Sequence, residues 1–400
     1  MEIVGVVAEY NPFHRGHALH LAQTRRVLGE DVAVVCVLSG DFVQRGEPAV
    51  FSKHARAEAA CRCGADLVVE LPLPWALSSA EGFARGAVYL LGALGCTALS
   101  FGSESGAIEP LEQIARELAN PRLQGKIREK LDKEPTLSYA EARQQAVADR
   151  LDGELAVLLE KPNSILAVEY LKAVYTLGLP IRPMTVRREG SEHDGEGGAF
   201  PSAKELRTLL RQGEDIADAL PDEAAAVFER EERLGRAILD HAALETAVLS
   251  RLRALDEVDF TALPDAREGL GTRLWRAART EPTLDAVLAA AGTKRYALSR
   301  LRRMLCAAAL GLTEEDAAGL PPYARVLAVT GLGRAVLREA ESRGEVPILT
   351  KPAAVRDLSP DCVRAFELGS GAHDLWVLGC PAVEERRGGG DYRTSPAVLP

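Results

Sequence analysis

Two histidines near the N-terminus, His14 and His17, are the residues whose type and spacing most clearly suggest chemistry. They follow an apolar run at 3–7 and stand at the predicted start of a helix over 18–28. Imidazoles beside the unpaired N–H groups of a helix N-terminus form a site suited to an anion. Gly16, between them, lets the backbone approach a ligand closely. The alternative is structural, because two histidines three residues apart can simply cap a helix.

Alternating strand and helix patterns over the first hundred residues must position this pair. The expected order is strand 3–7, helix 18–28, strand 32–38, helix 53–63, strand 67–71, helix 84–94 and strand 98–101. The run 32–38 is apolar throughout, which is typical of a parallel strand covered on both faces. The alternation predicts βαβ units and therefore an α/β fold with a doubly wound, Rossmann-like parallel sheet. Ligands bind at the carboxyl ends of such strands, where His14, Asp41 and Gly102 all fall.

The later part of the chain has a different character. Residues 108–160 are expected to be mainly helical, followed by a helix at 164–177, a last strand at 183–188, an acidic Gly-rich loop at 189–199 and a helix at 204–211. Further helices are expected over 222–255, 269–280, 283–291, 294–311 and 333–343, with strand-like runs at 346–349 and 375–378. We therefore predict an α/β domain over 1–212, with a helical insertion at about 108–160, and a mainly helical domain over 213–400.

Composition limits the class of protein. The hydrophobic share of 47% and the charged share of 26% are ordinary for a globular protein. The sequence contains no run of 18 apolar residues, so we expect no membrane span. It begins directly with a strand-like run and shows no signal peptide, and its seven cysteines are scattered, so we expect a cytoplasmic protein. Cys61 and Cys63 lack the spacing of a zinc motif, and we expect no metal centre in the protein itself.

Two acidic residues, Asp66 and Glu70, flank or end the predicted strand 67–71. A buried carboxylate requires a partner, so one of the two is expected to be structural. The net charge of −10 argues against a protein whose whole surface is basic and binds nucleic acid. It does not exclude RNA binding, because local basic patches determine the electrostatic field at the contact.

The element from His14 to His17, placed after a first strand, resembles the signature of the HIGH superfamily, which comprises nucleotidyltransferases and class I aminoacyl-tRNA synthetases. The longer run EYNPFHRGH at 9–17 more narrowly resembles the tRNA(Met) cytidine acetate ligases. Three other segments resemble the same family, namely SGDFVQRGEPA at 39–49, PNSILAVEYLKA at 162–173 and KRYALSRLRR at 294–303. The resemblance extends over essentially the whole chain.

This resemblance implies that the chain binds ATP and that His14 and His17 are catalytic. In the superfamily the two imidazoles stabilise the α-phosphate during in-line displacement of pyrophosphate, where preorganised donors meet the growing charge. The other ATP contacts that it implies are Val7, Ala8, Glu9, Tyr10, Asn11, Pro12, Phe13, Arg15, Gly16, Ala18, Leu19, His20, Gly102, Asn163, Arg187, Arg188, Ser202 and Arg207.

Some of these positions have an ordinary structural explanation as well. Gly102 could be a strand-end turn, and Asn163 a helix N-cap. Ser202 and Arg207 open a predicted helix, where the family holds the outer phosphates. The chain departs from the family there, since Lys204 and Glu205 replace the usual small or hydroxyl residues.

Two further sets of residues concern the other substrates. Asp41, Gln44 and Lys53 are expected in the neighbourhood of the substrate that reacts with ATP. Lys294, Arg295, Arg302 and Arg303 form a basic stretch expected to contact tRNA phosphates, with Tyr296 as a stacking surface. The alternative is a solvated helix face.

The leading interpretation is an ATP-dependent ligase that forms N4-acetylcytidine at the wobble position of elongator tRNA(Met). As the family implies, acetate first displaces pyrophosphate to give acetyl-adenylate, and the cytidine amine then displaces AMP. The expected ligands are ATP with Mg²⁺ bound through the triphosphate, acetate and tRNA(Met); no oligomeric state is assigned. One alternative is a small-molecule adenylyltransferase whose helical half is an oligomerisation module. Another is a non-catalytic tRNA-binding protein, which the presence of both histidines disfavours.

Overall fold

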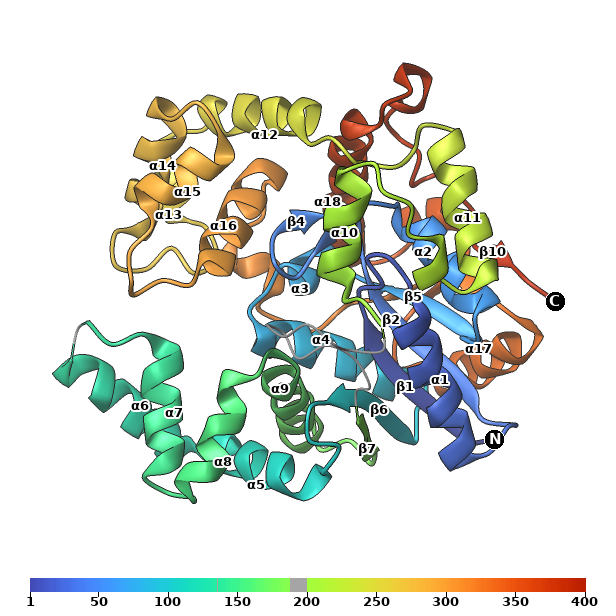
Figure 1. Ribbon diagram of the computed structural model, residues 1–400, viewed down its shortest axis with the longest axis horizontal. Coiled ribbons are helices and arrows are strands. Elements are labelled where there is room, and N and C mark those ends of the chain that lie inside the picture. Colours follow the sequence, from blue (N-terminus) through green and yellow to red (C-terminus); the bar gives the residue numbers. More distant parts are fainter. Residues whose placement is uncertain (135, 188–199) are drawn as a thin grey trace.

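The computed structural model describes residues 1–134, 136–187 and 200–400. Figure 1 shows a central sheet with helices on both faces and two helical lobes beside it. The strands are β1 (Ile3–Ala8), β2 (Ala33–Ser39), β3 (Phe42–Val43), β4 (Glu47–Pro48), β5 (Leu67–Leu71), β6 (Ala98–Ser103), β7 (Arg182–Arg187), β8 (Ala324–Val329), β9 (Ile348–Leu349) and β10 (Ala397–Val398).

The helices fall into three groups. Those around the sheet are α1 (Arg15–Leu28), α2 (Lys53–Arg62), α3 (Leu73–Ala76), α4 (Ala80–Ala93), α9 (Pro162–Leu177), α10 (Ala203–Arg211), α11 (Asp222–Arg233), α17 (Gly331–Arg343) and α18 (Pro360–Trp376). One lobe contains α5 (Ile108–Ala119), α6 (Pro121–Lys133), α7 (Tyr139–Ala148) and α8 (Gly153–Val157). The other contains α12 (Ala242–Ala254), α13 (Glu257–Thr261), α14 (Leu270–Thr280), α15 (Leu284–Ala291) and α16 (Leu298–Leu310). Short 3₁₀ segments lie at Leu158–Glu160, Ala217–Ala219, Glu314–Ala317, Pro352–Asp357, Val377–Gly379 and Val383–Glu385.

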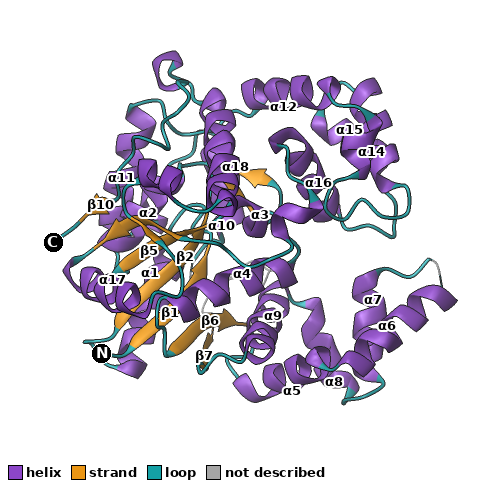
Figure 2. Ribbon diagram, turned by 180° about the vertical axis from the view of Figure 1, so that it is seen from behind, coloured by secondary structure: helices purple, strands orange, loops and turns teal. Residues whose placement is uncertain are grey.

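The main sheet has the strand order β10-β8-β5-β2-β1-β6-β7, with β9 beside β8. Figure 2 shows β5, β2, β1, β6 and β7 following one another across this sheet. Strands β5, β2, β1, β6 and β7 run parallel, so their carboxyl ends share one edge. The chain leaves β1 toward β2 on one side and reaches β6 on the other, which makes the β1/β6 boundary a topological switch point. Ligands of doubly wound sheets bind at such a point.

Alternate residues of the strands enter two different cores, as a sheet covered on both faces requires. Val35 and Val37 of β2 pack into the core formed with α4, α9 and α17. Val34 and Cys36, from the same strand, pack into the core formed with α1, α2 and α11. The predicted doubly wound α/β fold is therefore confirmed.

The C-terminal half differs from expectation in three places. The helical stretch predicted over 222–255 consists of two helices, α11 and α12. The prediction of a strand at 375–378 is wrong, because these residues form the end of α18 and the 3₁₀ turn that follows it. Strand β8 was not anticipated, and it pairs antiparallel with β5. Short apolar runs such as 324–329 do not distinguish a strand from a buried helix by periodicity. The domain boundary at residue 212 stays a prediction. The part of the chain beyond it contains three strands of the main sheet, β8, β9 and β10.

Asp66 ties three of these elements together at the amino end of β5. Its carboxylate accepts hydrogen bonds from Arg25 Nη2 of α1 (2.6 Å), from the backbone N–H of Val34 (2.8 Å) and from Thr330 Oγ1 (3.1 Å). Its carbonyl oxygen accepts the Thr330 N–H (2.8 Å), which fixes the turn between β8 and α17. The expectation that one acid of the Asp66/Glu70 pair is structural is met here.

Asp66→Ala should lower stability by about 3 kcal/mol, because it leaves the partly buried Arg25 guanidinium and the buried Val34 N–H without their acceptor. The measurement is urea or thermal unfolding, with exposed Asp31→Ala as the matched control. Equal unfolding midpoints for the two variants would show that Asp66 is not such an anchor.

Candidate active site

The two histidines form a reciprocal cap at the start of α1. His14 is the N-cap residue, and its Nδ1 accepts the Gly16 N–H (3.1 Å). His17 Nδ1 accepts the backbone N–H of His14 (3.3 Å), and the two ring centroids lie 3.8 Å apart. Because each Nδ1 acts as an acceptor, the proton of each neutral ring lies on Nε2, which makes Nε2 a donor. Capping therefore uses Nδ1 of each ring, and the expected contact with an anion would use Nε2.

An aromatic wall supports this pair of rings. Tyr10 adopts a positive φ of 45°, and the Asn11–Pro12 peptide bond is cis. The Tyr10 ring lies 4.8 Å from Phe13 and 4.8 Å from His17, edge-on to both, and Tyr10 and Phe13 are buried. The β1–α1 turn therefore presents the His17 ring from a packed base.

A small hairpin, defined here as residues 41–49 and containing β3 and β4, contacts the β1–α1 turn. Glu9 Oε1 accepts the Gln44 N–H (2.7 Å) from the hairpin, and Asn11 Oδ1 accepts the Val50 N–H (2.9 Å) just after it. Burial raises the pKa of Glu9, against the opposing effect of the Gln44 N–H and of nearby arginines, among them Arg45.

Two residues expected near the substrate, Asp41 and Lys53, are instead buried inside the protein. Asp41 Oδ1 accepts the backbone N–H of Lys53 (2.7 Å), and Lys53 Nζ lies 2.8 Å from Glu70 Oε1. Both side chains are committed to internal charges, and their expected place in the neighbourhood of the substrate stays a prediction. Gln44, the third residue of that set, is half-buried in the hairpin.

The carboxyl end of β6 brings two more expected residues together. Gly102 lies in β6, and Glu104 just beyond it accepts hydrogen bonds from Asn163 Nδ2 (3.0 Å) and Ser164 Oγ (2.7 Å) at the start of α9. Asn163 is the second residue of α9 and not its N-cap, so capping does not explain it. Glu104 was not among the expected site residues, although its place after a strand-ending glycine is the signal that could have indicated it.

The expected phosphate-binding residues lie on or before α10. Arg207 Nη1 donates to the carbonyl oxygen of Asn11 (2.8 Å), so α10 reaches the β1–α1 turn. Burial lowers the pKa of Arg207, while Glu47 and Glu9 oppose that shift. Ser202 is the N-cap of α10 and shares a capping box with Glu205. This pairing accounts for Glu205, the departure from the family pattern.

The remaining members of the ATP set have separate placements. His20 Nε2 lies 2.9 Å from Ser100 Oγ of β6, and Arg15 donates to the carbonyl oxygen of Asp218 (2.8 Å). Arg187 is the exposed last residue of β7, whereas Arg188 lies outside the described residues. Val7, Ala8, Pro12, Ala18 and Leu19 belong to β1, to the turn and to α1.

Arg45 lies in the quoted run SGDFVQRGEPA, where the sequence assigns it no role of its own. It is exposed on the hairpin, and its charge acts on both Glu9 and Arg207. Its position next to Gly46, in the turn between β3 and β4, is the signal that marks it.

The basic stretch 294–303 does not form one open helix face. Arg302 pairs with Glu47 of the hairpin (2.5 Å), Arg295 pairs with Glu268 (2.9 Å), and Arg303 is mostly buried, with its nearest acid, Asp265, 3.9 Å away. Lys294 is exposed in the turn before α16. Three of the four expected tRNA contacts are thus engaged within the protein.

Over residues 1–134, 136–187 and 200–400, no three His, Cys, Asp or Glu side chains cluster in a way that could hold a metal ion. Within the same ranges, every helix is too short or too polar to cross a membrane.

Comparison with known proteins agrees with this geometry over the full chain. The model of the HIGH nucleotidyltransferase family matches residues 1–390. A tRNA(Met) cytidine acetate ligase from Syntrophomonas wolfei is 36% identical, over 99% of this chain and 99% of the relative. One from Acetivibrio thermocellus is 32% identical over 100% of both chains.

Solved structures give the same result. Crystal structures of Thermotoga maritima TmcAL, in the apo form and bound with α-thio ATP, are each 33% identical to this chain and cover 100% of both chains. Their TM-scores are 0.93 and 0.92. The chain belongs to the tRNA(Met) cytidine acetate ligase family of HIGH nucleotidyltransferases.

Proposed function

We propose that this chain is an ATP-dependent ligase that joins acetate to the wobble cytidine of elongator tRNA(Met), forming N4-acetylcytidine, AMP and pyrophosphate. The observation that carries the proposal is the His14–His17 pair, whose Nε2 donors stand at the β1/β6 switch point of a sheet found in a family of acetate ligases. The similar Thermotoga maritima protein was crystallised with α-thio ATP, which supports ATP as the nucleotide.

In the first step an acetate oxygen attacks the α-phosphorus of ATP, and the bond to the pyrophosphate oxygen breaks. Negative charge grows on the phosphoryl oxygens, and donors that are already oriented lower that barrier most. His14 and His17 supply such donors, and Arg207 would hold the leaving pyrophosphate beside them. Acetyl-adenylate and pyrophosphate are the products of this step.

Mg²⁺ belongs to this step as part of the nucleotide. Mg²⁺ keeps several waters and is usually bound through substrate phosphates with one or two carboxylates, so the ion would enter this step with the triphosphate. It would neutralise charge on the leaving pyrophosphate.

In the second step the exocyclic amine of the cytidine attacks the acetyl carbonyl carbon, the bond to the adenylate oxygen breaks, and AMP leaves. A cytidine amine is a weak nucleophile, so positioning must supply much of the rate. The α12–α16 lobe is the candidate to hold the tRNA, because residues 242–312 carry eleven Lys or Arg and eight Asp or Glu, in a chain whose net charge is −10. The free state of all seven cysteines fits a reducing cytoplasm, where this reaction would occur.

The test is incubation of the protein with ATP, acetate and total tRNA, followed by nucleoside analysis. We expect N4-acetylcytidine, and we expect ATP–pyrophosphate exchange only when acetate is present. Exchange that requires a phosphomonoester in place of acetate would assign the chain to the small-molecule adenylyltransferases instead.

His17→Ala should reduce acetate-dependent pyrophosphate exchange by about 10²- to 10³-fold, because it removes one oriented donor at the α-phosphate. Binding of tRNA in a filter assay should stay close to that of the unaltered protein. The matched control is His241→Ala, which removes a half-exposed histidine near Arg211 and should leave exchange intact. A normal exchange rate in His17→Ala would remove His17 from the reaction.

Lys294→Glu should weaken tRNA binding by about three- to tenfold and reduce the salt slope of log K by about one. Lys294 is chosen because Arg302 and Arg303 contribute to folding contacts, so their loss would also disturb the hairpin. Lys351→Glu, an exposed lysine outside the lobe, is the control with the same change in charge. Identical salt slopes for the two variants would exclude Lys294 from the interface.

A further inference from the structure

A group of six charged side chains is buried between the sheet and the C-terminal segment, and two of its members come from near the end of the chain. We call it the buried ion cluster; it consists of Asp41, Lys53, Glu70, Arg325, His373 and Asp391. Lys53 Nζ lies 2.5 Å from Asp391 Oδ2 and 2.8 Å from Glu70 Oε1. Arg325 Nη1 bonds the same two acids, at 2.8 Å and 3.0 Å.

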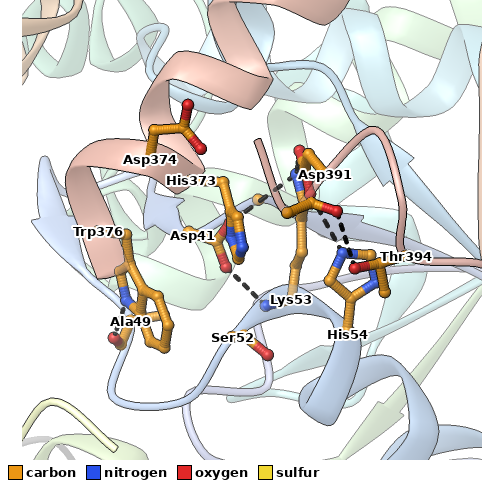
Figure 3. A network of polar contacts seen from close by, with 12 residues as sticks. Asp41, Ala49, Ser52, Lys53, His54, His373, Asp374, Trp376, Asp391 and Thr394 are labelled. Atoms are coloured by element: carbon orange, nitrogen blue, oxygen red, sulfur yellow. Dashed lines mark hydrogen bonds and ion pairs between the residues drawn. The ribbon is translucent and has the colours of Figure 1, made fainter. Parts of the chain in front are cut away.

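Helix α18 holds both ends of the hairpin from one face. His373 Nδ1 lies 2.9 Å from Asp41 Oδ2, and Trp376 Nε1, three residues further along the helix, donates to the carbonyl oxygen of Ala49 (2.7 Å) (Figure 3). The ends are also bonded to each other, because the Ala49 N–H donates to the carbonyl oxygen of Asp41 (2.8 Å). The two side chains of α18 therefore fix where the hairpin starts and where it stops.

The same hairpin contacts the β1–α1 turn that carries the histidine pair. Its Gln44 N–H is bonded to Glu9, and the adjoining Val50 N–H is bonded to Asn11. Arg45 at its tip acts electrostatically on Glu9 and on Arg207. A shift of the hairpin would therefore move charged groups around the proposed phosphate site.

The contacts of Asp41 within the cluster point to a protonated His373. Lys53 Nζ and Arg325 bond Glu70 and Asp391, whereas Lys53 Nζ stays 3.8 Å from Asp41 Oδ2. The buried Arg56 also acts on Asp41 and Glu70, but its nitrogens bond backbone carbonyl oxygens. His373, at 2.9 Å, is therefore the ionisable side chain nearest to Asp41. An unpaired buried charge is costly, and an imidazolium next to Asp41 removes that cost.

The groups that face His373 come from three elements. Asp41 faces it from the end of β2, Lys53 and His54 face it from α2, and Asp391 faces it from the C-terminal segment. Burial is the largest single influence and lowers the pKa of His373, but the charge and hydrogen bond of Asp41, together with the charge of Asp391, outweigh it and raise the pKa above the ordinary value. His373 therefore keeps its charge to a higher pH than an ordinary histidine does, and the charge is lost as the pH rises through the raised pKa.

We propose that His373 and Trp376 are positioning residues of the ligase. From α18 they hold the hairpin against the ATP-binding turn, and the affinity for ATP depends on the positive charge of His373. The inference rests on the proposed function only in naming ATP as the ligand of that turn.

The experiment measures calorimetric binding of a non-hydrolysable ATP analogue, with Mg²⁺, from about pH 7 to about pH 9.5. For the unaltered protein we expect the dissociation constant to rise as His373 loses its proton. His373→Asn keeps a neutral donor near the position of Nδ1 but cannot carry the charge. Its dissociation constant should be about tenfold higher at pH 7 and independent of pH above that point.

A second variant covers the case in which His373→Asn fails to fold. Trp376→Phe removes the donor to Ala49 and keeps an aromatic ring, and it should weaken nucleotide binding while preserving the pH dependence that His373 causes. The control is Arg143→Gln, which breaks a largely buried ion pair with Glu169 away from the hairpin (2.8 Å). It should lower the melting temperature without changing the dissociation constant.

Three results would overturn the inference. One is a dissociation constant of the unaltered protein that does not change over this pH range. Another is a His373→Asn protein whose melting temperature falls but whose nucleotide affinity and pH profile do not change. The third is a folded Trp376→Phe protein with normal affinity. None of these measurements needs acetate or tRNA, so failure of the ligase assay and failure of this inference can be told apart.

Discussion

The buried guanidinium of Arg56 joins the ends of the two central strands, and the arrangement of the site depends on it. Its nitrogens donate to the carbonyl oxygens of Glu9 (2.5 Å), Ser39 (3.1 Å) and Phe51 (3.0 Å), and also to that of Gly40. These carbonyls lie where β1 and β2 stop and where the chain turns toward α2, so no strand can satisfy them. Burial lowers the pKa of Arg56 to about 10, which still leaves it charged at neutral pH. One side chain thus fixes the spacing between the turn that carries His14 and the hairpin.

The hairpin in turn links the nucleotide-binding edge to the α12–α16 lobe. Phe42 is buried in the core of that lobe, and Glu47 pairs with Arg302 of α16. Gly46, with a φ of +74°, lies so close to α16 that a Cβ there would stand 2.5 Å from the Arg303 backbone nitrogen, and a glycine avoids both the strain and the clash. The basic helix and the proposed ATP site therefore share one small element, which suits a reaction whose second substrate is a nucleic acid.

Most helices and strands of the α/β half could be predicted from the local sequence. Apolar runs such as 33–39 and the helix starts near His14 and Ser202 are set by neighbouring residues, so periodicity and capping chemistry predict them well. Strand β8 escaped prediction because its partner β5 is more than 250 residues away, and nothing in the run 324–329 indicates that pairing. Long-range pairing of this kind is decided by tertiary packing and not by propensity.

The same distinction applies to the site. The histidine pair is visible in the sequence because its chemistry depends on residues three apart, whereas Asp41 and Lys53 were expected near the substrate. Only the structure reveals that Lys53 meets Asp391, 338 residues later, and that the pair is neutralised internally. An acid and a base near a strand end can thus lie near a substrate or form an internal ion pair. The sequence alone distinguishes these two cases only when the partners of both residues are close in the sequence.

Helix capping by the HRGH element, which the structure shows, is compatible with the phosphate binding that we propose for it. A cap on Nδ1 fixes the rotation of each ring and leaves its proton on Nε2, so the structural role prepares the chemical one. A histidine that bound phosphate without such a cap would need to be ordered by the ligand, and ordering a side chain costs free energy. The capping box therefore orients the two imidazole rings before the proposed site binds ATP. Electrostatic catalysis requires preorganisation of this kind.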